Sequence, residues 1–179
     1  MIHRSLACGA VKAVLGLGAN LGDPADTFRK AAKAIANVDG VTVTAAAPLY
    51  VSRPWGKTDQ PDFTNSALLI ETQLSPRRLL AALLEVEKEL GRIRTEPWGP
   101  RVIDIDILVY GEELLAEPEL SIPHPHLTER SFALKPLVDL WPTAKIGERP
   151  ASEILARLDL SDLTPAGAGN WHREPLRRN

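Results

Sequence analysis

The most constraining feature of this sequence is the alternation of isoleucine and aspartate within residues 102–108, Val-Ile-Asp-Ile-Asp-Ile-Leu. Side chains along a β-strand point alternately to opposite faces of the sheet. The isoleucines therefore share one face, which helices should cover. Asp104 and Asp106 share the other face, where strand geometry places them about 7 Å apart. The segment predicts a strand whose sheet has helices on one side and acidic side chains on the other.

Apolar runs and helix-capping residues outline the other elements. Strands are predicted at residues 11–18, 41–47, 66–72 and 101–110, and helices between Asp23 and Gly40 and between Ser75 and Gly91. Each helix begins with a capping residue followed by proline and ends at a glycine. Residues 50–62 and 92–100 contain proline and glycine and are expected to form long loops.

The order strand, helix, strand, strand, helix, strand predicts an α+β fold of the ferredoxin-like type. This split βαβ sandwich has an antiparallel sheet with both helices on one face. Short helical stretches are expected near Arg130 and at residues 151–158. We expect residues 1–10 to be a flexible extension, residues 11–160 to be a single domain, and residues 161–179 to be a loosely ordered tail.

Composition excludes several classes of protein. The chain has 179 residues, of which 44% are hydrophobic and 25% charged, as in an ordinary globular domain. A net charge of −2 argues against a dedicated nucleic-acid-binding protein, and no apolar run approaches the length of a membrane span. The single cysteine, Cys8, cannot form an internal disulfide, and the apolar part of residues 1–10 is too short for a secretory signal. We therefore expect a cytoplasmic monomer that binds neither nucleic acid nor membrane.

The aspartate pair predicts a magnesium site. Two nearby carboxylates repel each other, and a bound cation relieves that repulsion. Mg²⁺ prefers one or two carboxylates together with substrate phosphates. The alternative is that the aspartates only hydrate the open face of an antiparallel sheet. Arg92, Arg94 and Arg101 favour the magnesium site, because arginines together with Mg²⁺ bind polyphosphate.

Several separated motifs resemble the 6-hydroxymethyl-7,8-dihydropterin pyrophosphokinase family of folate biosynthesis. The signature consists of Arg-Ile-Arg at residues 92–94 and Trp-Gly-Pro-Arg-Val-Ile-Asp-Ile-Asp-Ile at residues 98–107. The resemblance extends from about residue 13 to residue 158 and includes Gly-Ala-Asn-Leu-Gly at 18–22, Asp-Gln-Pro-Asp-Phe-Thr-Asn at 59–65, Ile-Pro-His at 122–124 and Arg-Ser-Phe at 130–132. It implies a ferredoxin-like fold, in agreement with the order of elements.

The resemblance also implies a reaction in which ATP and the pterin alcohol give AMP and the pterin diphosphate. Asp104 and Asp106 would hold two Mg²⁺ ions, and Arg92 and Arg101 would stabilise the transferred group. The residues implied for ATP binding are Glu87, Arg94, Trp98, Arg101, Ile107, Ser121, His124 and Arg130. Those implied for the pterin are Phe63 and Phe132 as stacking partners, Asn65 at the ring edge, and the backbone near Ser52 to Trp55.

Each of these assignments has a plainer alternative. The two phenylalanines are core residues by default, although Phe63 follows a polar loop. Asn65 alone is consistent with a cap at the start of a strand, and Glu87 with a solvated helix face. His124 and His126 suggest a zinc pair, but two histidines without further ligands make a poor zinc site.

The sequence departs from the family pattern at three positions. Pro97 stands where the family usually has arginine, Pro125 where tyrosine is common, and Glu119 where a basic residue is frequent. These departures affect the contacts to the nucleotide and leave the reaction class unchanged.

Two other functions fit the sequence less well. An RNA-binding module of the same fold would carry aromatic residues on its central strands, whereas this strand carries carboxylates. A dinucleotide-binding fingerprint begins at Gly16 and Gly18, but its third glycine falls at Gly22, one residue too late.

Overall fold

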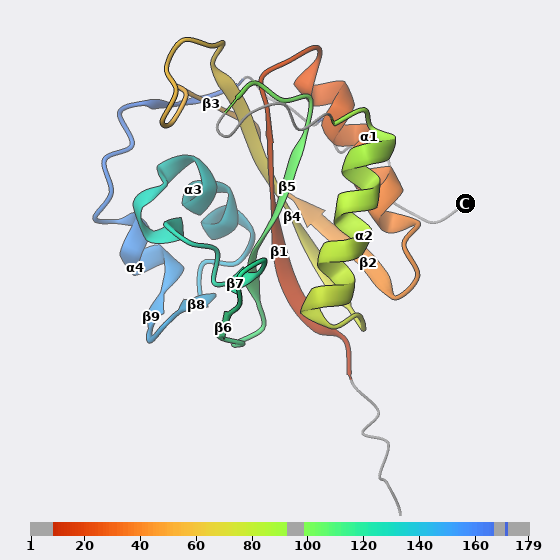
Figure 1. The fold of residues 1–179 in the computed structure, drawn as a ribbon. Coiled ribbons are helices and arrows are strands. Elements are labelled where there is room, and N and C mark those ends of the chain that lie inside the picture. The colour runs from red at the N-terminus through yellow and green to blue at the C-terminus, as the bar shows by residue number, and fades with distance from the viewer. Residues whose placement is uncertain (1–8, 93–98, 167–170, 172–179) are drawn as a thin grey trace, which may run out of the picture.

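The computed structural model describes residues 9–92, 99–166 and 171 (Figure 1). The larger elements are β1 (Val11–Ala19), α1 (Pro24–Ala36), β2 (Val41–Ala46), β3 (Tyr50–Ser52), β4 (Phe63–Thr72), α2 (Pro76–Glu89), β5 (Asp104–Tyr110) and α3 (Ser131–Leu140). The shorter ones are β6 (Leu115–Ala116), β7 (Ser121–Ile122), the 3₁₀ turn Leu127–Glu129, β8 (Lys145–Ile146), β9 (Arg149–Pro150), α4 (Ala151–Leu155) and β10 (Leu163–Pro165). None of the described helices is long and apolar enough to cross a membrane.

The main sheet is antiparallel and has the order β10-β3-β4-β1-β5, with β2 also paired to β4. The long strand β4 pairs with β3 through its first residues and with β2 through its last residues. This α+β arrangement confirms the predicted ferredoxin-like fold. It brings β5, the strand that carries both aspartates, next to β1 near the start of the chain.

Helices α1 and α2 cover one face of the sheet, as predicted (Figure 1). The Asp23 side chain caps α1 by accepting a hydrogen bond from the Asp26 N–H at 3.1 Å, and Pro24 occupies the first turn. Phe28 and Ile35 of α1 are fully buried. The three isoleucines of the alternating segment lie in the same core, so that face of β5 is apolar and closed.

Helices α3 and α4 pack on the opposite face of the sheet (Figure 1). A bulge in β5 shapes this side, because the register to β1 shifts between Val14 and Leu15. Leu108 is thereby left without a partner in β1, and it joins Val109 in the core beneath α3. The part of this face near Asp104 and Asp106 forms a pocket.

The structure differs from the predicted elements in three places. The predicted loop 50–62 begins with strand β3, and β4 begins at Phe63, three residues earlier than predicted. Strand β5 begins at Asp104, so residues 101–103 precede it as an irregular segment. In each case a partner from a distant part of the chain sets the strand limits.

The expected loosely ordered tail is wrong for Leu163–Pro165 and Trp171. Leu163–Pro165 forms β10 along β3, and Ala166 donates a backbone hydrogen bond to the Leu49 carbonyl at 2.9 Å. The Trp171 ring is buried against Phe28, and its Nε1–H donates to the Ala47 carbonyl at 2.9 Å. This segment pairs with the edge of β3, and at the break after β2 it adds a second hydrogen bond to the Ala47 carbonyl, which also accepts one from the Ser66 hydroxyl.

Candidate active site

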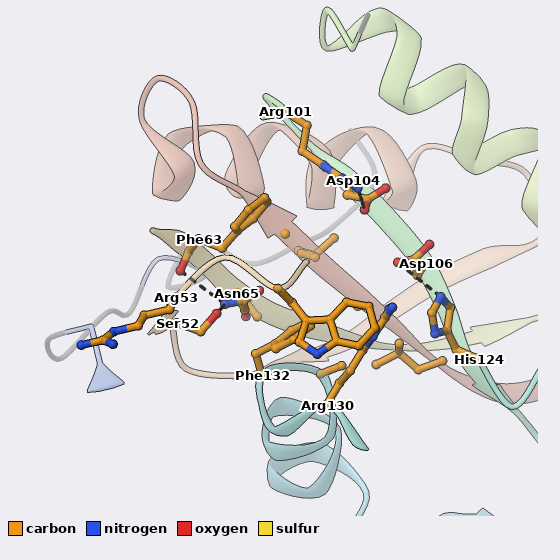
Figure 2. A pocket seen from close by; sticks show the side chains of 17 residues that line it. Ser52, Arg53, Phe63, Asn65, Arg101, Asp104, Asp106, His124, Arg130 and Phe132 are labelled. Atoms are coloured by element: carbon orange, nitrogen blue, oxygen red, sulfur yellow. Dashed lines mark hydrogen bonds and ion pairs between the residues drawn. The ribbon is translucent and has the colours of Figure 1, made fainter. Parts of the chain in front are cut away.

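A pocket opens on the sheet face between β1, β5 and the start of α3 (Figure 2). The predicted site residues that line it are Ser52, Trp55, Phe63, Asn65, Arg101, Asp104, Asp106, His124, Arg130 and Phe132. They come from β3, β4, β5 and α3 and from the segments before β4, β5 and α3, so the fold brings together residues that are up to 80 positions apart.

Glycines of β1 help to form the pocket wall. Gly16 and Gly18 both line it, and a Cβ atom at Gly16 would lie only 3.0 Å from a methyl carbon of Leu108. A side chain at Gly16 would therefore require Leu108, the bulged residue of β5, to shift by a few tenths of an ångström. The Gly16-Leu17-Gly18 stretch leaves room beside the sheet backbone, which explains these glycines without a dinucleotide-binding role.

Asp104 is the centre of an ionic cluster. Its carboxylate contacts Arg92 Nη1 at 2.7 Å and also pairs with Arg101. Arg92 in turn pairs with Glu87, which is buried beneath the strand. The Glu87 carboxylate also accepts the backbone N–H of Ile105 at 2.7 Å. Burial raises the pKa of Glu87, while the Ile105 N–H and Arg92 favour its charged form.

Asp106 lies beside His124, with 3.7 Å between the carboxylate and Nε2. Burial, followed by the neighbouring charges of Asp104 and Glu87, raises the pKa of Asp106 to about 7. Because 44% of the Asp106 side chain is open to the pocket, solvent weakens the burial contribution. Burial and the charge of Arg130 lower the pKa of His124, so its contact with Asp106 at neutral pH involves an uncharged ring.

The carboxylate pair fits Mg²⁺. Asp104 and Asp106 line the same pocket wall, and the charge of Asp104 raises the pKa of Asp106, as expected for two acids without a shared cation. Carboxylate oxygens are the hard ligands that Mg²⁺ selects, and one or two of them are enough when substrate oxygens complete the shell.

A second part of the pocket lining consists of aromatic rings and a buried amide. Asn65 is buried, and its Nδ2 donates to the Ser52 hydroxyl at 3.0 Å and to the Phe63 carbonyl at 3.3 Å. These bonds fix the orientation of the amide in the wall. The rings of Phe63 and Phe132 both line the pocket (Figure 2). The wall thus presents two aromatic rings and a polar edge.

Sequence reasoning assigned no role to Asn20 or to the side chain of Arg53. Asn20 is buried at the end of β1, and its Oδ1 accepts the Arg101 N–H at 2.8 Å. Its Nδ2 donates to the Gln60 side chain at 3.0 Å and the Pro61 carbonyl at 3.1 Å, so Asn20 joins the loop before β4 to the segment before β5. The asparagine between glycines at the end of a strand was the available signal. Arg53 lines the pocket and had no comparable signal.

Several predicted residues lie away from the pocket wall. Glu87 and Ile107 are buried on the helix side of β5, and Ser121 is half-buried in β7. Arg92 is not among the described residues that line the pocket, and it contacts Asp104 and Glu87. Arg94 and Trp98 lie outside the described residues. The roles implied for these residues in nucleotide binding remain predictions.

Comparison with known proteins identifies the family. A model of the 7,8-dihydro-6-hydroxymethylpterin-pyrophosphokinase family matches residues 14–142. A 2-amino-4-hydroxy-6-hydroxymethyldihydropteridine pyrophosphokinase of Methylorubrum extorquens is 43% identical over 152 residues, covering 85% of this chain and 96% of the relative. The Pseudomonas aeruginosa protein of that name is 42% identical over 143 residues, covering 79% of this chain and 88% of the relative.

Solved structures agree in fold. The crystal structure of Plasmodium falciparum HPPK-DHPS matches with a TM-score of 0.66 at 16% identity. The match covers 85% of this chain and 44% of that longer one. At this identity the likeness concerns the fold alone. The family match and the curated relatives, taken with the pocket, show that this chain belongs to the 7,8-dihydro-6-hydroxymethylpterin-pyrophosphokinase family.

Proposed function

We propose that this protein transfers the diphosphate of ATP to the hydroxymethyl group of 6-hydroxymethyl-7,8-dihydropterin, giving AMP and the pterin diphosphate in folate biosynthesis. The names of the relatives support the reaction. The observation that carries it is the pocket itself, in which a carboxylate pair and two arginines lie beside two aromatic rings, with Arg101 5.8 Å from the centre of Phe63 and Arg130 6.0 Å from that of Phe132. A polyphosphate and a flat heterocycle need these surroundings.

The pterin belongs against the two phenylalanine rings. Its ring would stack between Phe63 and Phe132, while the Asn65 amide, held by Ser52, meets the polar edge of the ring. Stacking on a phenyl ring accepts many flat heterocycles. The buried Asn65 amide selects among them, because only some carry the matching hydrogen-bonding groups. The backbone near Trp55 would complete the part of the pocket that holds the pterin.

The triphosphate belongs beside the carboxylate pair. Arg101, His124 and Arg130 line the pocket there, and Arg92 reaches it through Asp104. The two arginines that now pair with Asp104 carry planar guanidinium groups that also suit phosphate oxygens. Phosphoryl-type transfer depends mainly on positioning and charge neutralisation, which these residues supply.

Mg²⁺ would be held by Asp104 and Asp106, and when bound it neutralises charge on the phosphates. We propose two ions, following the family resemblance, and a monomeric protein in the cytoplasm that binds neither nucleic acid nor membrane.

The direct test mixes purified protein with Mg²⁺–ATP and the hydroxymethyl-dihydropterin and follows both products by chromatography. We expect AMP and pterin diphosphate in equal amounts, and little AMP when the pterin is omitted. Formation of ADP with a pterin monophosphate, or AMP release that is independent of the pterin, would contradict the proposal.

A further inference from the structure

The indole of Trp55 lies against the guanidinium of Arg130 at the rim of the pocket. The Arg130 Cζ is 4.3 Å from the centre of the Trp55 ring and 6.0 Å from that of Phe132. Trp55 comes from the loop before β4, and Arg130 is the residue that precedes α3. The contact therefore joins two separate walls of the pocket.

Stacking of this kind holds the cation without using its hydrogen-bond donors. A guanidinium attracted to an aromatic ring lies over the ring face, and tryptophan provides the strongest attraction among the aromatic side chains. The N–H groups of arginine project in the plane of the guanidinium, so they stay directed away from the stacked face. A stacked arginine is thus already oriented to receive a planar or anionic oxygen group.

The surrounding charges explain why Arg130 needs such support. Asp106 and Asp104 attract the guanidinium, Glu129 also attracts it, and Arg101 repels it. A long arginine side chain loses considerable rotamer freedom when it is held in one geometry. Figure 2 shows Arg130 and Phe132 on the α3 side of the pocket, across from Asp104 and Arg101. The Trp55 indole restricts the conformations that the Arg130 side chain can adopt among these charges.

We propose that Trp55 is a positioning residue for Arg130, which it holds flat at the rim so that the N–H groups meet the oxygens of an entering triphosphate. The inference rests on the proposed function, which supplies that triphosphate. It gives the Trp55 side chain a role in nucleotide binding, whereas the family resemblance places only the backbone near Trp55 beside the pterin. The Trp55→Leu variant should therefore weaken ATP binding and spare the pterin.

Calorimetric titration with a non-hydrolysable ATP analogue and Mg²⁺ measures this effect directly. Trp55→Leu is expected to raise the Kd of the analogue about fivefold, equivalent to about 1 kcal/mol. Trp55→Phe keeps an aromatic face and should stay within about twofold of the unchanged protein. Trp141→Leu is the matched control, because the Lys12 ammonium lies 5.0 Å over the Trp141 ring and neither residue lines the pocket. It should leave the Kd unchanged.

A double-mutant cycle shows whether Trp55 acts through Arg130. Arg130→Met removes the cation, so adding Trp55→Leu to that variant should change the Kd less than about twofold. Pterin affinity, measured with the analogue present, should differ less than about twofold between Trp55→Leu and the unchanged protein. Additive effects in the cycle, or a Trp55→Leu variant that weakens pterin binding and spares the nucleotide, would overturn the inference. Titration needs no turnover, so a protein that binds the analogue but forms no AMP would refute the proposed function and leave this test valid.

Discussion

The Glu87 carboxylate of α2 accepts a hydrogen bond from the backbone N–H of Ile105 at 2.7 Å, between the two aspartates of β5. The Glu87 side chain is 3% exposed and pairs with Arg92, which contacts Asp104. A helix residue thus anchors the strand that carries the proposed metal ligands, from the side opposite the pocket.

Replacing Glu87 should destabilise the fold. Glu87→Leu leaves a buried N–H without its acceptor and removes one of the two carboxylates that pair with Arg92, at a cost of about 3 kcal/mol. Glu87→Gln keeps an acceptor for Ile105 and should cost about 1 kcal/mol. Urea unfolding measures both, with Glu85→Gln as a control, since Glu85 is 68% exposed on the same helix. If Glu87→Leu has the same urea midpoint as the unchanged protein, the contacts of Glu87 do not contribute to the stability of the fold.

Removing either aspartate should abolish activity while leaving the fold largely intact. Asp104→Ala or Asp106→Ala is expected to lower turnover by on the order of a thousandfold or more, because a charge-neutralising ligand is lost in the transition state. Circular dichroism checks folding, and Asp26→Ala on the surface of α1 is the control. Near-normal turnover in folded Asp106→Ala protein would argue against a metal held by both acids.

The raised pKa of Asp106 predicts a stability effect that depends on pH. Between its ordinary value of 3.8 and about 7, the folded state binds more protons than the unfolded state, so stability falls as pH rises. Asp106→Asn cannot ionise and should stabilise the metal-free protein at pH 8 by about 1–2 kcal/mol, a figure reduced for the exposed part of the side chain.

Urea unfolding of both proteins without Mg²⁺ measures the difference. The advantage of Asp106→Asn should shrink toward pH 5, where the native carboxyl is largely protonated, and also when Mg²⁺ is added to the unchanged protein at pH 8. If the free energy of unfolding of the two proteins changes with pH in parallel, the neighbouring charges do not raise the pKa of Asp106.

Phe63→Ala should weaken pterin binding far more than ATP binding. Stacking of a flat heterocycle on a phenyl ring is worth roughly 1–3 kcal/mol by analogy with base stacking. Calorimetry with the pterin, in the presence of a non-hydrolysable ATP analogue, measures the loss, and a second titration follows the nucleotide. Equal losses for both ligands would mean that Phe63 serves general packing.

Trp171→Ala should lower stability by about 3 kcal/mol, because a buried tryptophan and its hydrogen bond to Ala47 are both lost. Trp171→Phe keeps the contact with Phe28 and should cost less. Thermal unfolding measures both variants, and Trp141→Ala serves as a partly exposed control. An unchanged Tm for Trp171→Ala would indicate that the segment after β10 adds nothing to the fold.

Local patterns were sufficient to predict much of this protein. The alternation in β5 separates buried isoleucines from aspartates that face the pocket, because the side-chain period of a strand is fixed by its backbone. Proline after a capping residue starts α1 and α2 where predicted. Motifs spread along the chain were enough to identify the family, and all but the Arg-Ile-Arg motif at 92–94 contribute a residue to the described pocket wall.

Only the tertiary structure decided the rest, because it depends on partners distant in sequence. Three residues in a proline-rich loop become β3 by pairing with β4 and with β10, more than 100 positions later. The bulge at Leu108 exists only against β1. Asn20 reaches Arg101 across 81 positions, and Trp55 reaches Arg130 across a pocket that no local pattern describes. Local sequence sets which face a side chain occupies, whereas long-range pairing determines what that side chain meets.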